Sequence, residues 1–231
     1  MRRSEAGLGL IELMVSLVLG MLVVLGLTEV FLSVRATYST QQSSALLQED
    51  ARYVLSKIAQ EIRMVGMFGC LPSDRIIDAP SAFQRPISWQ GPPGSRSLHM
   101  VSADVGLQGG KPDWTVVSDC TTSAQAYSGT RSSLAPGEIA FPVRELFYRF
   151  ENGQLKSGPN KTVLLDNVAA FDVSFGVADP SNPHSVTRYE DSPGDVASIR
   201  SVRIALTLRD PGGRVKDQGY HLMVALRNRL V

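Results

Sequence analysis

The feature that most constrains this chain is an apolar stretch near its beginning, from Leu8 to Val34. As a helix it would be about 40 Å long, which exceeds the roughly 30 Å hydrocarbon thickness of a bilayer. Apolar residues make up 43% of the 231-residue chain but concentrate in this stretch. The sequence therefore predicts one membrane-spanning helix followed by one domain with its own core.

Two glutamates interrupt the apolar stretch. Only about 24 Å of uncharged helix separates Glu12 from Glu29, so at least one carboxylate lies in or near hydrocarbon. An ionised side chain at the bilayer centre costs about 2.5–3.5 kcal/mol or more on insertion scales. We expect Glu29 at the outer interface. Glu12 either pairs with a positive charge or rests, partly hydrated, at the inner interface.

The basic pair Arg2 and Arg3 precedes the apolar stretch, so the positive-inside rule keeps the first residues cytoplasmic and places everything after Val34 outside. A cleaved secretory signal is one alternative, although the stretch is longer than such signals need and Val34-Arg35-Ala36 is a poor cleavage site. A plain uncleaved anchor is the other alternative.

The N-terminal residues "AGLGLIELMVSLVLGML" resemble the class III signal of type IV prepilins and type II secretion pseudopilins. That signal is a short basic leader ending in glycine, followed by an apolar residue and by a glutamate at the fifth mature position. Here Gly7 would end the leader, Leu8 would become the N-terminus and Glu12 takes the fifth position. Two departures are a leucine in place of the usual phenylalanine and a helix without proline.

The resemblance implies that a membrane prepilin peptidase cleaves after Gly7 and that Leu8 is then N-methylated. Cleavage would expose an ammonium group on Leu8 within an apolar segment. A carboxylate on Glu12 of a neighbouring subunit can pair with it, and each charge is then compensated by the other. Glu12 is therefore predicted to act in assembly.

An apolar stripe continues after Val34 at helical spacing, through Leu47, Ala51, Val54, Ile58, Ile62 and Val65. Because no proline occurs before Pro72, the helix is predicted to run unbroken to about Met64 and to end near Gly66 and Gly69. The stripe is expected to pack on a sheet of the same chain.

The stretch around Arg63, Gly66 and Phe68-Gly69-Cys70, together with the ending "VALRNRL", resembles the PilW family of minor pilins. That resemblance implies a nonenzymatic filament subunit of the bacterial inner membrane, with a periplasmic head, that moves into an extracellular pilus. The implied partners are other minor pilins, the major pilin, the prepilin peptidase, the inner-membrane assembly platform and a tip adhesin. It implies roles in priming assembly, adhesion and twitching motility. J-type minor pseudopilins of type II secretion systems share much of this layout.

Cys70 and Cys120 are the only cysteines. In an oxidising periplasm an even pair is expected to form a disulfide, worth about 4 kcal/mol in the chain-entropy model. A catalytic thiol is the alternative, but no histidine is near either cysteine in the sequence.

The later part of the chain shows strand patterns. A hairpin is predicted around Asn152-Gly153, and apolar residues alternate over 171–177, 202–208 and 220–226. Residues 71–136 are rich in turn formers and indicate only short strands and loops. The fold class is α+β, one helix across an antiparallel sheet, and the resemblance names it a pilin fold. The expected segments are a leader 1–7, a transmembrane half-helix 8–34, an amphipathic half-helix 35–69 and a β-rich head 70–231.

Motifs for catalysis, cofactors or metals are not found, so none of these is predicted. The net charge of +1 gives no field to attract nucleic acid, and no nucleic-acid binding is expected. The acidic residues of 179–195 share a loop whose spacing fits no calcium-binding pattern, and calcium binding there stays open. A membrane-tethered periplasmic enzyme or binding protein also stays open, since active sites built from distant residues leave no sequence spacing.

Overall fold

The computed structural model describes residues 9–92, 95–104 and 111–226. It begins with one long helix, α1 (Leu10–Met64), which contains no proline and carries Arg63 in its last turn. The chain forms two compact units, residues 1–46 and residues 47–231, so the helix belongs to both. The prediction of an unbroken helix ending at about Met64 is confirmed.

The first unit consists of the N-terminal part of α1 alone. The second unit contains the end of α1 and all the strands. Its elements after α1 are η1 (Ser73–Arg75), β1 (Ile76–Ile77), η2 (Ser81–Phe83), β2 (Ile87–Gln90), β3 (Ser97–Ala103), β4 (Trp114–Ser118), β5 (Ala124–Ser128), β6 (Ile139–Glu151), β7 (Gln154–Ser157), β8 (Thr162–Leu165), β9 (Val168–Asp179), β10 (Asn182–Glu190), η3 (Val196–Ser198), β11 (Ile199–Leu208) and β12 (Gln218–Ala225).

The strands form two sheets, whereas the sequence predicted one. Sheet A has the order β1-β5-β4-β6-β3-β2, with β7 pairing β6 and β8 pairing β7, and sheet B has the order β10-β9-β11-β12. All pairs are antiparallel except β1 with β5. The predicted hairpin at Asn152-Gly153 joins β6 to β7, and both turn residues have positive φ (54° and 72°), as a type I′ turn requires.

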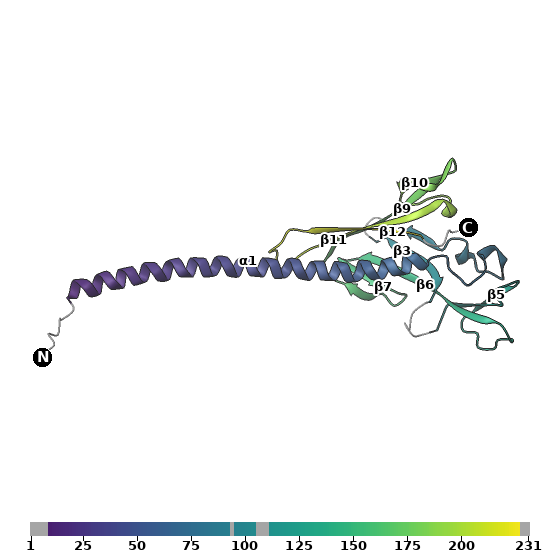
Figure 1. Cartoon of the computed structure of the whole chain (residues 1–231), viewed down its shortest axis with the longest axis horizontal. Helices are drawn as coiled ribbons and strands as arrows, with labels where there is room; N and C mark the ends of the chain where they lie inside the picture. The colour runs from purple at the N-terminus through teal and green to yellow at the C-terminus, as the bar shows by residue number, and fades with distance from the viewer. Residues whose placement is uncertain (1–8, 93–94, 105–110, 227–231) are drawn as a thin grey trace. The chain divides into compact units, whose positions relative to one another are not determined.

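The end of α1 lies alongside strands of both sheets (Figure 1). The predicted stripe is buried: Leu47, Ala51, Val54, Ile58, Ile62 and Val65 are each at most 7% exposed. They share one core with residues of both sheets, where Trp89 of β2 meets Phe171 of β9 edge to face at 5.7 Å between ring centroids. The amphipathic pattern therefore arises because this part of the helix has to cover two sheets at once.

The helix stops where the chain turns into sheet A. Gly66 has φ +76°, the left-handed conformation common after a helix C-terminus, and its N–H donates to the carbonyl of Val101 at 3.1 Å. One residue further, the carbonyl of Met67 accepts from the N–H of Ala103 at 2.6 Å. The end of α1 is thus joined directly to β3.

A polar contact also fastens α1 to sheet A. The Glu61 carboxylate accepts from the Tyr148 hydroxyl of β6 at 2.5 Å and pairs with Lys57 at 2.7 Å. Tyr148 is buried, and its burial, followed by the charge of Glu61, raises the pKa of its hydroxyl far above 10. The phenol therefore stays protonated and donates to the carboxylate under all ordinary conditions.

Replacing Tyr148 by phenylalanine should lower the free energy of unfolding by about 1–3 kcal/mol at pH 7, because Glu61 loses a buried donor. The raised folded-state pKa means that Tyr148 contributes fully to stability below pH 10 and that this contribution is lost as the pH rises above it. The variant should lack this alkaline loss. Thermal unfolding of the full chain in detergent, between pH 7 and 11, measures both effects.

The matched control is Tyr38→Phe, since Tyr38 lies on the same helix but is 66% exposed. It should leave the unfolding temperature unchanged. Equal behaviour of the two variants would contradict a stabilising role for the contact between α1 and β6.

Candidate functional site

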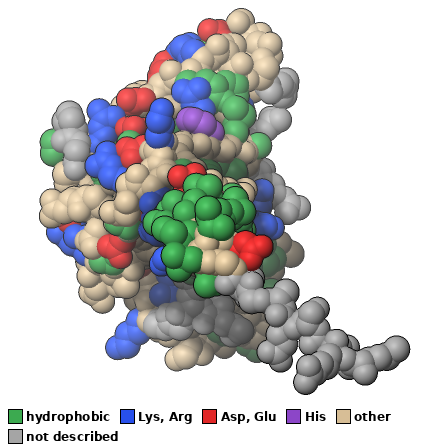
Figure 2. All heavy atoms as spheres, turned by 90° about the vertical axis from the view of Figure 1, so that its left-hand side faces the viewer, with side chains coloured by type: hydrophobic (Ala, Val, Ile, Leu, Met, Phe, Trp, Pro, Cys, Tyr) green, Lys and Arg blue, Asp and Glu red, His purple; other side chains and the backbone are tan. Residues whose placement is uncertain are grey.

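The N-terminal part of α1 is apolar on every side. Large hydrophobic side chains throughout it are more than half exposed: Leu10, Ile11, Leu13, Met14, Val15, Leu17, Val18, Leu19, Met21, Leu22, Val23, Val24, Leu25, Leu27, Val30, Phe31, Leu32 and Val34. Seen from this end, hydrophobic side chains cover the helix with acidic groups among them (Figure 2). An all-round apolar helix is the form that a lipid bilayer accepts, and α1 is long and apolar enough to cross one.

Two hydroxyl groups of this segment are satisfied inside the helix. Ser16 donates to the carbonyl of Glu12 at 2.7 Å, and Thr28 donates to the carbonyl of Val24 at 2.8 Å. In lipid there is no water to serve these groups, so bonding to a carbonyl four residues earlier removes the cost of burying them. Ser16 and Thr28 therefore do not interfere with insertion.

Glu12 lies in the first turn of α1. One carboxylate oxygen, Oε2, accepts from the backbone N–H of Gly9 at 3.2 Å, at the helix end where the macrodipole favours negative charge. Among the described residues the second oxygen has no hydrogen-bond partner. Gly7 and Leu8, the predicted cleavage position and new N-terminus, lie outside the described residues. The pairing of Glu12 with a neighbour's ammonium group therefore stays a prediction.

The predicted disulfide between Cys70 and Cys120 is present, with the two Cα atoms 5.3 Å apart. It joins the segment just after α1 to the loop between β4 and β5. Asp119 closes that loop: its carboxylate accepts from the backbone N–H groups of Thr121, Thr122 and Ser123, and the bond from Ser123 lowers its pKa most.

The hydroxyl of Ser118 completes the same loop. It accepts from the N–H of Cys120 at 3.0 Å and donates to the carbonyl of Ser123 at 2.8 Å. The roles of Ser118 and Asp119 were not predicted from the sequence. Aspartate and serine side chains in turns commonly accept a hydrogen bond from the backbone N–H two residues later, which is the signal that could have found them. Cys120 sits at positive φ (58°), which these bonds help to maintain.

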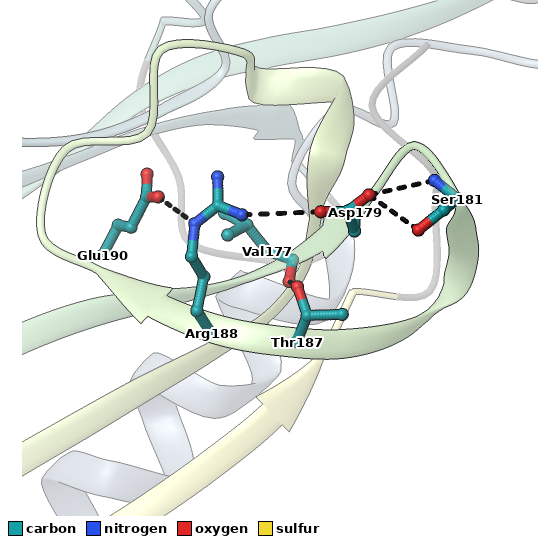
Figure 3. A network of polar contacts seen from close by, with 6 residues as sticks. All are labelled: Val177, Asp179, Ser181, Thr187, Arg188 and Glu190. Carbon is teal, nitrogen blue, oxygen red and sulfur yellow. Dashed lines mark hydrogen bonds and ion pairs between the residues drawn. The ribbon is translucent and has the colours of Figure 1, made fainter.

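Much of the acidic segment 179–195 is not a loop, because β10 occupies Asn182–Glu190 and pairs with β9. The side chains of Asp179 and Glu190 both point at Arg188 (Figure 3), and Asp179 also accepts from the N–H and hydroxyl of Ser181 at 3.0 and 2.8 Å. The bonds from Ser181 lower the pKa of Asp179.

The remaining two acids of this segment also have protein partners. Asp191 pairs with Arg96 at 3.2 Å, and Asp195 accepts from the N–H of Ala197 at the start of η3. Across the part of the chain that the structure describes, no three His, Cys, Asp or Glu side chains come together as metal ligands would. Within the described structure, each acid of this segment therefore has a partner in the chain itself.

A cavity of about 1330 Å³ opens beside the end of α1, between the segment after the helix and η3. Its ionisable side chains are Arg63, Asp74, Arg85 and Asp195, and its cysteine, Cys70, is held in the disulfide. Among the residues that line it there is no histidine, so the described structure offers no nucleophile with a histidine base at this place.

Comparison with known families identifies one segment. Residues 2–28 match the model described as the prokaryotic N-terminal methylation motif. This range contains Gly7, Leu8 and Glu12, and it supports a place for the chain in the superfamily of type IV pilins and pseudopilins, whose members are structural. No curated protein and no solved structure matches this chain.

Removing the disulfide by changing both Cys70 and Cys120 to serine should lower the free energy of unfolding by about 2–5 kcal/mol. The bond closes a loop of 50 residues that contains short strands and few other constraints. Thermal unfolding of the full chain in detergent measures the loss. Cys70→Ser alone should match the double variant, and an unchanged unfolding temperature would contradict a stabilising role.

Proposed function

We propose that this chain is a minor pilin of the type IV pilus, similar to the PilW family. The single observation that carries the proposal is the N-terminal segment: an all-round apolar helix with a carboxylate at Glu12, inside a matched N-terminal methylation motif. In an ordinary membrane anchor, a carboxylate in the first apolar turn only adds to the cost of insertion. In a subunit that joins neighbours in lipid, the same carboxylate can pair with a neighbour's ammonium group.

In this proposal a prepilin peptidase cleaves after Gly7, Leu8 is N-methylated, and the head faces the periplasm. The subunit waits in the inner membrane and is then transferred into a filament with other minor pilins and the major pilin, through the assembly platform. It helps to prime assembly and lies near the tip, where it helps to present an adhesin. The same architecture serves a J-type minor pseudopilin of a type II secretion system, which is the alternative.

Mass spectrometry of the mature N-terminus tests the proposal most directly. The expected result is a chain that begins with N-methylated Leu8. A chain that begins at Met1, or one cut near Ala36, would reject it in favour of a plain anchor or a secretory signal. Deletion separates the two filament systems, since loss of twitching motility supports the pilus and loss of secreted proteins supports the pseudopilin.

Replacing Glu12 by leucine should leave membrane insertion intact and abolish incorporation into filaments. The neighbour's ammonium group would then have no carboxylate to pair with in lipid, and an uncompensated charge there costs about 2.5–3.5 kcal/mol or more. Incorporation is measured by immunoblotting of sheared filaments, and insertion by membrane fractionation.

Glu29→Leu is the matched control, because it removes a carboxylate from the same helix outside the methylation motif, which ends at residue 28. It should incorporate like the unaltered chain. Normal incorporation of Glu12→Leu would refute the assembly role of Glu12.

A further inference from the structure

Strand β12 forms one edge of sheet B, and among the described strands it pairs with β11 alone. The N–H of Leu226 donates to the carbonyl of Arg200 at 2.9 Å, which identifies their pair as a hydrogen-bonded one. Since such pairs alternate along an antiparallel ladder, Leu222 and Val224 bond to β11. His221 and Met223 therefore direct their backbone N–H and C=O groups away from the sheet, as do the two residues that flank them, Gly219 and Ala225.

The other edges of the described sheets are protected against pairing. On the opposite edge of sheet B, β10 contains Pro183, the charged Arg188 and two register shifts. In sheet A the outer strands are short, with two residues in β1 and four each in β2 and β8. Short strands, prolines, charges and bulges are the usual means by which proteins keep strand edges from pairing.

None of these protections is present in β12. It has eight residues and an unbroken register with β11, and its sequence contains no proline, lysine, arginine, aspartate or glutamate. Within the described residues, its outward backbone groups have no hydrogen-bond partner in the chain. An edge that is long, regular and uncharged is suited to pairing with another strand.

The hydrophobic core also reaches this edge. Tyr220 and Leu222 are only partly buried and pack against the main core, while Met223 on the opposite face of the strand is 61% exposed. An added strand with apolar side chains toward α1 would cover Tyr220 and Leu222 and so remove apolar area from water. The occupant that fits is an extended segment in which apolar and polar residues alternate.

One arrangement of identical copies is disfavoured. Pairing of β12 with β10 of a second copy meets Pro183 and the register shifts of that strand. Sheet B therefore has one edge, β12, that is suited to accept an added strand. Its other edge, β10, is poorly suited to serve as that strand in a second copy.

We propose that β12 is a strand-addition site for an extended segment of a different subunit, one that itself carries a prepilin-type N-terminus. The proposal rests on the function proposed above, because that function supplies neighbours that share the membrane and its direction. The partner's strand would bond to the N–H and C=O groups of His221 and Met223 and would lay its apolar side chains over Tyr220 and Leu222.

The test uses a photo-crosslinking amino acid at position 221 of the full chain, in membranes of cells that naturally produce the protein. The expected product is a crosslink to a second protein whose N-terminus carries the methylation motif, identified by mass spectrometry. Met223→Pro should reduce the product about tenfold or more, because proline removes an outward N–H and leaves the bonds to β11 in place. Met223→Val, which keeps the N–H, should give the product at the level of the unaltered chain.

The crosslinker at Arg188, on the opposite edge, should give no such product. An intact Cys70–Cys120 disulfide and an unchanged protein level show that Met223→Pro still folds. Absence of the crosslink, its persistence in Met223→Pro, or a product made of two copies of this chain would overturn the inference. If Leu8 is N-methylated in the same cells, such a result rejects the strand-addition site alone; a chain that begins at Met1 rejects the proposed function and the partner class together.

Discussion

A carboxylate at the start of an apolar helix is the constraint on which the rest depends. Glu12 lies in the first turn of a helix whose neighbouring large side chains are apolar, and within the described residues its carboxylate meets only the N–H of Gly9. A hydrogen bond to one backbone donor compensates a negative charge far less than an opposite charge does. The single chain is thus electrostatically incomplete in a membrane, and this incompleteness is what favours a subunit over an anchor.

The helix that carries this charge has two parts with different surfaces. Up to Val34 its large hydrophobic side chains are exposed on all sides, as lipid requires, and from Leu47 onward an apolar face of the helix is buried by two sheets. The contact of Glu61 with Tyr148 and the turn at Gly66 fix the end of the helix to sheet A. Packed and hydrogen-bonded contacts therefore hold the end of α1 within the head.

Periodic features were predictable from the sequence, and features that depend on distant partners were not. The stripe from Leu47 to Val65, the turn at Asn152-Gly153 and the alternation over 171–177 each repeat at the spacing of their own element, and all three are found. The division into two sheets was missed because it depends on which strands of the turn-rich middle segment join β6, and nothing local specifies that. The partner of Glu61 lies 87 residues away, so only the fold reveals it. The predicted cleavage after Gly7, the predicted methylation of Leu8 and the predicted pairing of Glu12 each involve another protein, so one chain does not display them.

The two edges of sheet B differ in a way that stability alone does not require. A monomer is served equally well by two protected edges, and a self-propagating fibre would need two open ones. With one open edge and one blocked edge, sheet B can be extended by a single added strand and no further. Under the function proposed above, that asymmetry suits a subunit present in few copies with a defined neighbour, because a major subunit has to repeat the same contact along a whole filament.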